Sequence, residues 1–149
     1  MKFTLAAAFI SAIVSAVQAH PEPAAAASLQ NAVTALGYHQ EGDAAQIHPE
    51  QTPITIPFYR LYSPAADDHF YTMSASERDT AAASLGYVEE GITGYVYETP
   101  LCGTVPLYRM YKGKTRDHFY TANAEEKDNA VNNLGYTLEG IAAYVNPQA

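Results

Sequence analysis

A five-residue segment that combines an acid, an imidazole and two aromatic rings occurs twice in this chain. The sequence DHFYT begins at Asp68 and again at Asp117. Neighbouring Asp and His side chains are residue types used in general acid–base catalysis, and a repeated imidazole with Tyr can also bind polar ligands. A third interpretation is that the segment belongs to a scaffold that is itself repeated. The secondary structure and the repeats that contain each DHFYT segment decide among these three interpretations.

The two segments lie within a much longer internal repeat. Residues 57–96 align without a gap on residues 106–145, with an offset of 49 and identity at 21 of 40 positions. Residues 31–47 match the end of the same unit, at the same offset from residues 80–96, but lack its first half. We therefore expect a single domain over 20–149, built from three repeats. They are 20–56 (partial), 57–105 and 106–149.

Turn, cap and glycine signals divide each full repeat into short elements. Two aromatic, β-prone runs flank the turn-like sequence SPAADD. Ser74 and Glu77 match a capping box, which predicts a helix of roughly ten residues that ends at Gly86. The sequence after it predicts two further extended segments with Gly91 at the turn between them. The predicted unit is strand, strand, helix, strand, strand.

The predicted fold class is α+β with three pseudo-repeats of this unit, the first one partial. One such unit cannot bury its own apolar face, so the copies must pack on one another. We expect a closed pseudo-threefold arrangement of short antiparallel strands with three short helices. An open stack of repeats is the alternative.

The N-terminus and the composition restrict location and partners. Residues 1–19 have a basic start, an apolar run and a small-residue end, which predicts a signal peptide and a secreted, extracellular protein. The formal net charge of −8 argues against nucleic acid and membrane surfaces as partners. Cys102 is the single cysteine, so no disulfide can form within one chain. The oligomeric state stays open.

The repeated motifs also resemble a known family. The segments YRLY, DHFYT, ASERD and LGYVEEGI are similar to a tandem repeat of secreted fungal and bacterial proteins, classed as a domain of unknown function. In larger proteins this repeat accompanies hydrolase domains, which implies a binding or accessory role. The partial first repeat lacks the YRLY and DHFYT half, so a site built from that half should be absent or altered there.

Strand alternation sorts the candidate site residues onto one face. If the two aromatic strands pair with Tyr62 opposite His69, then Arg60 lies opposite Tyr71. The other face, which carries Leu61 and Phe70 with Tyr59 and Thr72, is the more apolar and is the predicted core face. The candidate ligand-binding residues are Arg60, Tyr62, His69 and Tyr71, with Arg109, Tyr111, His118 and Tyr120 in the second full repeat.

These residue types suit a polysaccharide or glycoconjugate. Aromatic rings stack on the C–H faces of sugars, while guanidinium and imidazole groups hydrogen-bond hydroxyls. We expect a small non-enzymatic binding module that uses no cofactor, and two equivalent sites would give avidity on a polymer. The alternatives are a scaffold role for the same residues and a secreted protein-interaction, structural or effector protein without a sugar site.

Enzymatic alternatives rest on fewer features, and we predict no catalytic residue and no metal ligand. A glycosidase could use Asp68 and Glu90 as its carboxylate pair, but nothing in the sequence brings them together. Cleavage after residue 19 would make His20 the N-terminal residue, as in copper-dependent polysaccharide oxidases, with His39 or His48 as a further ligand. No zinc spacing, calcium loop or serine nucleophile motif accompanies these residues.

Overall fold

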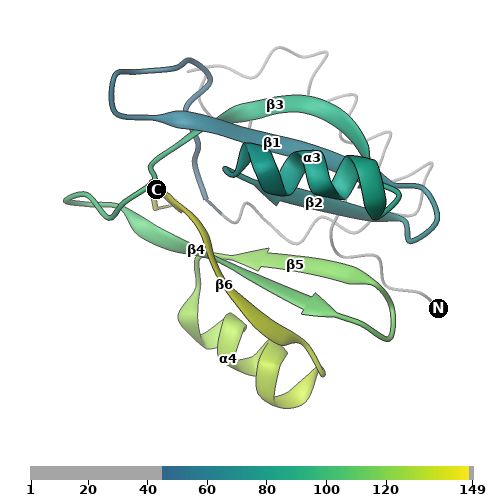
Figure 1. Cartoon of the computed structure of the whole chain (residues 1–149). Coiled ribbons are helices and arrows are strands. Elements are labelled where there is room, and N and C mark those ends of the chain that lie inside the picture. The colour runs from purple at the N-terminus through teal and green to yellow at the C-terminus, as the bar shows by residue number, and fades with distance from the viewer. Residues whose placement is uncertain (1–44, 148–149) are drawn as a thin grey trace, which may run out of the picture.

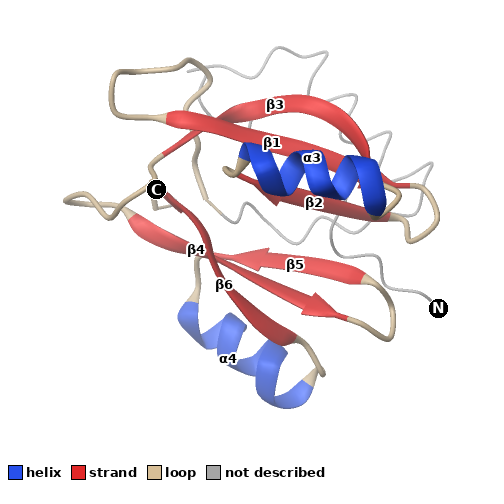
Figure 2. Ribbon diagram, viewed as in Figure 1, coloured by secondary structure: helices blue, strands red, loops and turns tan. Residues whose placement is uncertain are grey.

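The computed structural model describes residues 45–147, which form two similar units of three strands and one helix. Each unit corresponds to one full repeat, and the two units lie against each other (Figures 1 and 2). The first full repeat contains β1 (Ile56–Ser63), β2 (Asp68–Thr72), α3 (Ala75–Ser84) and β3 (Val88–Val96). The second contains β4 (Val105–Lys112), β5 (Asp117–Thr121), α4 (Ala124–Asn133) and β6 (Thr137–Val145).

The predicted closed pseudo-threefold arrangement with three helices is wrong for the described residues. They form two separate antiparallel sheets, ordered β2-β1-β3 and β5-β4-β6, with two helices. The physical reason is that each full repeat pairs its three strands with one another, so its main ladders are completed within the repeat. The predicted signal peptide and most of the partial repeat lie outside the described residues.

The end of each repeat also differs from the prediction. We expected two extended segments with a turn at Gly91, but β3 is one strand that pairs with β1 along its length. Gly91 has φ of 99° and lies between two register shifts, so its glycine conformation serves a β-bulge. The chain bends at this point without reversing. As a result, Glu90 has no Cα partner on β1.

The predicted hairpin register is confirmed in both repeats. Arg60 pairs with Tyr71 and Tyr62 with His69 between β1 and β2. The same pairs recur 49 residues later between β4 and β5. Asp67 ends the first hairpin loop with φ of 54°, a left-handed conformation that Asp tolerates well. The candidate site residues therefore do share one face of each hairpin.

Both faces of the first hairpin are buried, whereas the sequence predicted one core face. Leu61 and Phe70 pack with Ala81 of α3, as expected for the predicted core face. On the opposite face, Phe58 and Tyr71 belong to a second cluster that is shared with the other repeat. The helix packs on the side of the hairpin that carries Leu61 and Phe70. Tyr71, on the other side, packs in the cluster that both repeats share.

The predicted helix ends are confirmed. The Ser74 side chain accepts a hydrogen bond from the Glu77 backbone N–H, and α3 spans ten residues as expected. Gly86 follows the C-cap residue with φ of 77°, in the left-handed region where glycine is favoured. Asn123 caps α4 in the same way. These caps fix where each helix starts beside its hairpin.

Three short backbone bridges join two sets of positions, each of which recurs at the offset of 49: Gln46, Tyr95 and Tyr144 in one set, and His48, Tyr97 and Asn146 in the other. Gln46 bridges to Asn146, His48 to Tyr95, and Tyr97 to Tyr144. Ala45 and Ile47 are buried in the cluster that both repeats share. The short segment before β1 therefore packs against the ends of β3 and β6.

Substituting Gly94 by alanine should detach this segment. A Cβ at Gly94 would lie 2.5 Å from Ile47 Cδ1 and 2.9 Å from the His48 carbonyl oxygen, so the backbone must move. We expect a loss of about 1–3 kcal/mol in the free energy of unfolding, measured by urea denaturation. Gly113→Ala is the control, because its Cβ would meet only Tyr111 at 3.8 Å. Equal losses in the two variants would contradict this packing.

Candidate functional site

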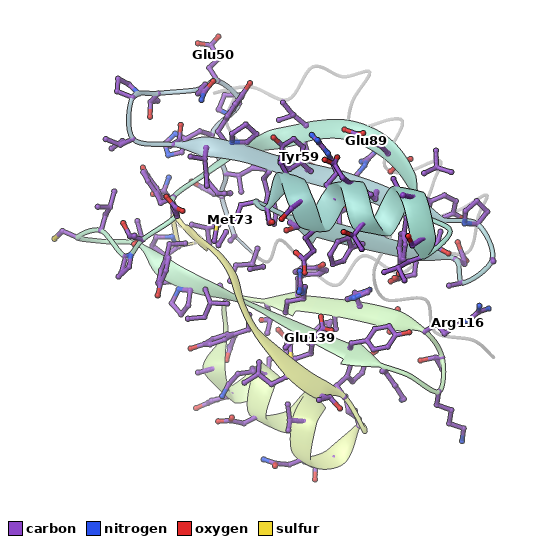
Figure 3. All side chains as sticks on the ribbon, in the orientation of Figure 1. Glu50, Tyr59, Met73, Glu89, Arg116 and Glu139 are labelled. Atoms are coloured by element: carbon purple, nitrogen blue, oxygen red, sulfur yellow. The ribbon has the colours of Figure 1, made fainter. Side chains whose placement is uncertain are left out.

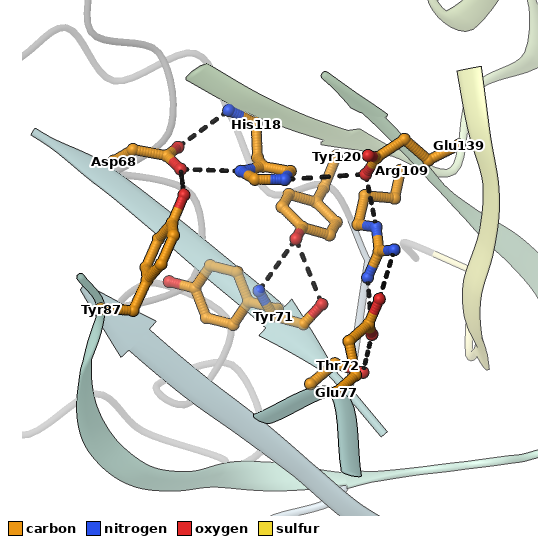
Figure 4. Close-up of polar contacts among 9 residues, drawn as sticks. All are labelled: Asp68, Tyr71, Thr72, Glu77, Tyr87, Arg109, His118, Tyr120 and Glu139. Carbon is orange, nitrogen blue, oxygen red and sulfur yellow. Dashed lines mark hydrogen bonds and ion pairs between the residues drawn. The ribbon is translucent and has the colours of Figure 1, made fainter. Parts of the chain in front are cut away.

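The two DHFYT segments meet each other across the interface between the repeats. Asp68 accepts hydrogen bonds from the backbone N–H of His118 at 2.8 Å and from the Tyr87 hydroxyl at 2.6 Å. The other interaction of its carboxylate is with His118 Nδ1, at 2.7 Å (Figure 4). Asp68 is completely buried. The acid of the first segment therefore pairs with the imidazole of the second, and not with its own neighbour His69.

The fourth residue of the segment makes a second contact across this interface. The Tyr120 hydroxyl accepts from the backbone N–H of Tyr71 at 2.8 Å and donates to its carbonyl oxygen at 3.1 Å. Tyr120 thereby satisfies both backbone groups of a residue on the edge strand β2. Burial raises the pKa of Tyr120, so its hydroxyl stays protonated. Tyr120 is a structural residue in this arrangement.

A guanidinium links three elements beside these contacts. Arg109 on β4 donates to both carboxylate oxygens of Glu77, at 2.8 and 3.0 Å, and to Glu139 Oε2 at 2.8 Å. Glu139 is skipped in the pairing of β6 with β4, so a bulge directs it toward the space between the repeats (Figure 3). Burial lowers the pKa of Arg109, but its bonds to Glu77 outweigh this effect and raise it.

The role of Glu77 extends beyond the capping box. Its backbone N–H donates to Ser74, as predicted, while its side chain accepts from Thr72 and from Arg109 of the other repeat. Burial opposes ionisation of this carboxyl, but the hydrogen bonds from Arg109 and Thr72 prevail and lower its pKa. Glu77 therefore carries its negative charge at neutral pH.

A cavity of about 380 Å³ lies at this interface, within the size range of small-molecule sites. Aromatic rings form part of its wall: the centroid of the His118 ring lies 4.6 Å from that of Tyr111 and 5.0 Å from that of Phe70. The Arg109 guanidinium lies over the Phe70 ring at 4.9 Å. Glu77, Tyr87, Arg116 and Glu139 add polar groups to the same wall.

The structure separates the eight predicted site residues into two sets. Arg109, Tyr111 and His118 line the cavity, whereas Tyr120 is buried between the repeats. In the first full repeat, Arg60 pairs with Glu90 at 2.8 Å and His69 lies 3.3 Å from the same carboxylate. The remaining pair are Tyr71, which is fully buried, and Tyr62, which is half-buried and donates to Asp67.

Several residues of this cavity were missing from the sequence-based prediction, among them Phe70, Glu77, Tyr87 and Glu139. Phe70 was assigned to the core face and Glu77 to a helix cap, and both assignments are correct but incomplete. Tyr87 and Glu139 lie beyond the helices, on the segments for which a turn was predicted. The sequence did hold one signal for these two residues. Tyr87 is identical to its counterpart Tyr136, and Glu139 to its counterpart Glu90, at the offset of 49.

The carboxylates of the cavity do not match the pair that a glycosidase uses. A glycosidase needs one carboxylic acid with a raised pKa, but the pKa of Glu77 is lowered, and Arg109 bonds both Glu77 and Glu139. The predicted pair of Asp68 and Glu90 is not brought together: Asp68 contacts His118 and Tyr87, while Glu90 contacts Arg60 and His69. For the copper alternative, His20 and His39 lie outside the described residues. The remaining candidate, His48, has its Nε2 at 2.7 Å from the Tyr97 hydroxyl.

A family model described as "Domain of unknown function (DUF5648)" matches residues 18–146. No curated protein and no solved structure matches the chain. Within residues 45–147, no helix combines the length and the apolar character needed to cross a bilayer.

Proposed function

Since the chain belongs to the family described as Domain of unknown function (DUF5648), we propose from the site itself that it is a small secreted, non-enzymatic module that binds glycan or cell-wall material. The observation that carries this proposal is the cavity between the repeats. It combines aromatic rings with a guanidinium, an imidazole and carboxylates. Secretion is proposed from the signal-peptide pattern of residues 1–19.

The chemistry of a neutral sugar fits this wall. Tyr111 and Phe70 offer apolar ring surface to C–H groups, and the half-buried Tyr87 adds a further ring, whose hydroxyl donates to Asp68. Carboxylates accept hydrogen bonds from sugar hydroxyls, and Arg109 donates to sugar oxygens while its carboxylate partners hold it in place. A preorganised set of this kind binds without first ordering its side chains.

A second candidate function, a protein-interaction module, is favoured by exposed apolar residues that recur in both repeats. Leu85 is 64% exposed and Ile92 is 50% exposed. Their counterparts at the offset of 49 are Leu134, which is 50% exposed, and Ile141, which is 44% exposed. Apolar side chains that stay exposed at equivalent positions offer apolar area to a protein partner.

Sedimentation with insoluble polysaccharide tests the first candidate. We expect chitin, cellulose or fungal cell wall to remove the protein from the supernatant, and Tyr111→Ala to weaken this binding about tenfold because a stacking ring is lost. Tyr62→Ala is the matched control. Tyr62 occupies the same strand position in the first full repeat but does not line this cavity.

The possible outcomes separate the candidates. Binding that depends on Tyr111 and not on Tyr62 supports the cavity as the site. Equal loss in both variants would place the ligand on the repeated surfaces instead. If every polysaccharide leaves the protein in solution and a glycan array is blank, the sugar proposal is wrong.

A further inference from the structure

Arg116 lines the cavity and, among the described residues, has no carboxylate partner. The other arginines of the chain, Arg60, Arg78 and Arg109, each pair with an acidic side chain at 2.6 to 2.8 Å. Arg116 instead donates from Nη2 to the backbone carbonyl oxygen of Ala65 at 2.8 Å. A guanidinium has five N–H donors, so most of those on Arg116 remain available to a ligand. The wall therefore carries a cation that no described carboxylate pairs with.

The backbone and the side chain of Arg116 are both held in place. Arg116 ends the loop between β4 and β5 with φ of 57°, and its backbone N–H donates to the Lys112 carbonyl oxygen at 2.8 Å. Its bond to Ala65 reaches the loop between β1 and β2, in the other repeat. Figure 3 shows Arg116 beside these loops, with Glu139 nearer the middle of the interface. The guanidinium therefore lies at one end of the cavity wall.

The repeat contains an internal comparison for this residue. The counterpart of Arg116 is Asp67, which has a similar φ of 54° and accepts from the Tyr62 hydroxyl at 2.8 Å. The counterpart of Tyr62 is Tyr111, which also lines the cavity. Because a guanidinium has no acceptor, Arg116 cannot take the place of Asp67 in this bond. The change from acid to base therefore brings a cation to the cavity and leaves the Tyr111 hydroxyl without the bond that Tyr62 makes.

The protonation state of Tyr111 and the pairing of the nearby acids favour an anion at this end. Burial and the charge of Asp68 raise the pKa of Tyr111, although Arg116 lowers it, so the hydroxyl stays protonated and can donate. Glu77 and Glu139 both accept hydrogen bonds from Arg109. The donors of Arg116 and Tyr111 are thus free of these carboxylates, and they match an anionic group of a ligand.

We propose, on the basis of the glycan-binding function above, that the ligand is an acidic glycan whose uronate carboxylate binds Arg116 and the Tyr111 hydroxyl. A guanidinium can bind a carboxylate through two parallel N–H···O bonds, which are stronger than bonds to neutral hydroxyls. The ring surfaces of the wall contact the sugar as described above. The formal net charge of −8 opposes a polymer with a charge on every sugar. The uronate therefore belongs to an otherwise neutral chain.

An NMR titration of the purified protein with two matched trisaccharides tests this proposal. The first is xylobiose that carries one glucuronic acid, and the second is its methyl ester, which differs only by loss of the charge. We expect the acid to bind about tenfold more tightly than the ester, and added salt to reduce this preference. Tyr111→Phe keeps the ring but removes the hydroxyl, and it should reduce the preference about threefold.

Arg116→Asn should abolish the preference for the acid, and Lys114→Asn is its matched control. Asn tolerates the left-handed backbone of position 116. Lys114 is an exposed cation of the same loop that does not line the cavity, so its loss should leave the preference intact. Equal loss of preference in the two variants would overturn the proposal, because the effect would then be one of general charge.

The remaining outcomes separate this proposal from the glycan-binding function on which it rests. If the ester binds as tightly as the acid, the uronate proposal is wrong and glycan binding stands. If neither trisaccharide binds but insoluble neutral polysaccharide removes the protein from solution, the uronate proposal is again wrong alone. If neither trisaccharide nor any polysaccharide binds, both proposals are wrong.

Discussion

Asp68→Ala is expected to lower the free energy of unfolding by about 3–5 kcal/mol, the largest effect of any single substitution proposed for this chain. The carboxylate is fully buried and serves the His118 backbone N–H, the His118 ring and the Tyr87 hydroxyl. Removing it leaves all three groups buried without their partner, which costs more than the loss of one hydrogen bond. Urea denaturation followed by tyrosine fluorescence measures the change.

Asp117→Ala is the matched control, because Asp117 holds the same position in the other repeat. Its carboxylate bonds Tyr136, and its second oxygen has no partner in the described part of the chain. Burial raises the pKa of Asp117, although the bond from Tyr136 acts in the opposite direction. We expect its loss to cost less than half as much. A control variant as unstable as Asp68→Ala would show that the contact between the segments has no special weight.

Arg109→Ala is expected to cost about 2–3 kcal/mol, while Arg60→Ala should cost below about 1 kcal/mol. Arg109 is 16% exposed and bonds two carboxylates on different elements, whereas Arg60 is 29% exposed and pairs with Glu90. The substitution leaves Glu77 and Glu139 facing each other without their shared cation. Thermal unfolding of both variants at neutral pH measures the difference.

The pH dependence of stability adds an independent readout for Arg109. Burial opposes the charge on Glu77, but the bonds from Arg109 and Thr72 lower its pKa below the usual 4.5. A lowered carboxyl pKa stabilises the folded state above pH 4.5, and this contribution is lost as the pH falls through the folded-state pKa. Arg109→Ala should weaken this acid sensitivity. An unchanged acid profile would contradict the role assigned to the Glu77 pair.

The local structure of each repeat could be predicted because its signals are local. Ser74 and Gly86 mark the two ends of α3, and alternation along two short strands sorts Arg60 and Tyr71 onto one face. Such features depend on residues a few positions apart. Gly91 was misread because a glycine with positive φ serves equally well in a hairpin turn and in a bulge. The two cases differ in the pairing of the flanking residues. Here the residues on both sides of Gly91 pair with the same strand, β1, so the chain does not reverse.

The contacts between repeats could not be predicted in the same way. Asp68 and His69 are adjacent in the sequence, yet the partner of Asp68 is His118 in the other copy. Because His69 and His118 hold equivalent positions in identical segments, the sequence does not distinguish which of them pairs with Asp68. The cavity follows from the same contact, since Phe70 and Tyr87 of one repeat face Arg109 of the other. An interface between two copies requires their relative placement, which the spacing of residues within one copy does not contain.

A double-mutant cycle between Asp68 and His118 tests the pairing of the two DHFYT segments most directly. The stabilities of Asp68→Ala, His118→Ala and the double variant give the coupling energy of the pair. We predict coupling of about 2 kcal/mol for this pair, within the range found for residues in direct contact. The equivalent cycle for Asp117 and His69, in dilute protein, should give coupling near zero. Negligible coupling between Asp68 and His118, or equal coupling in both cycles, would contradict the pairing that forms the cavity.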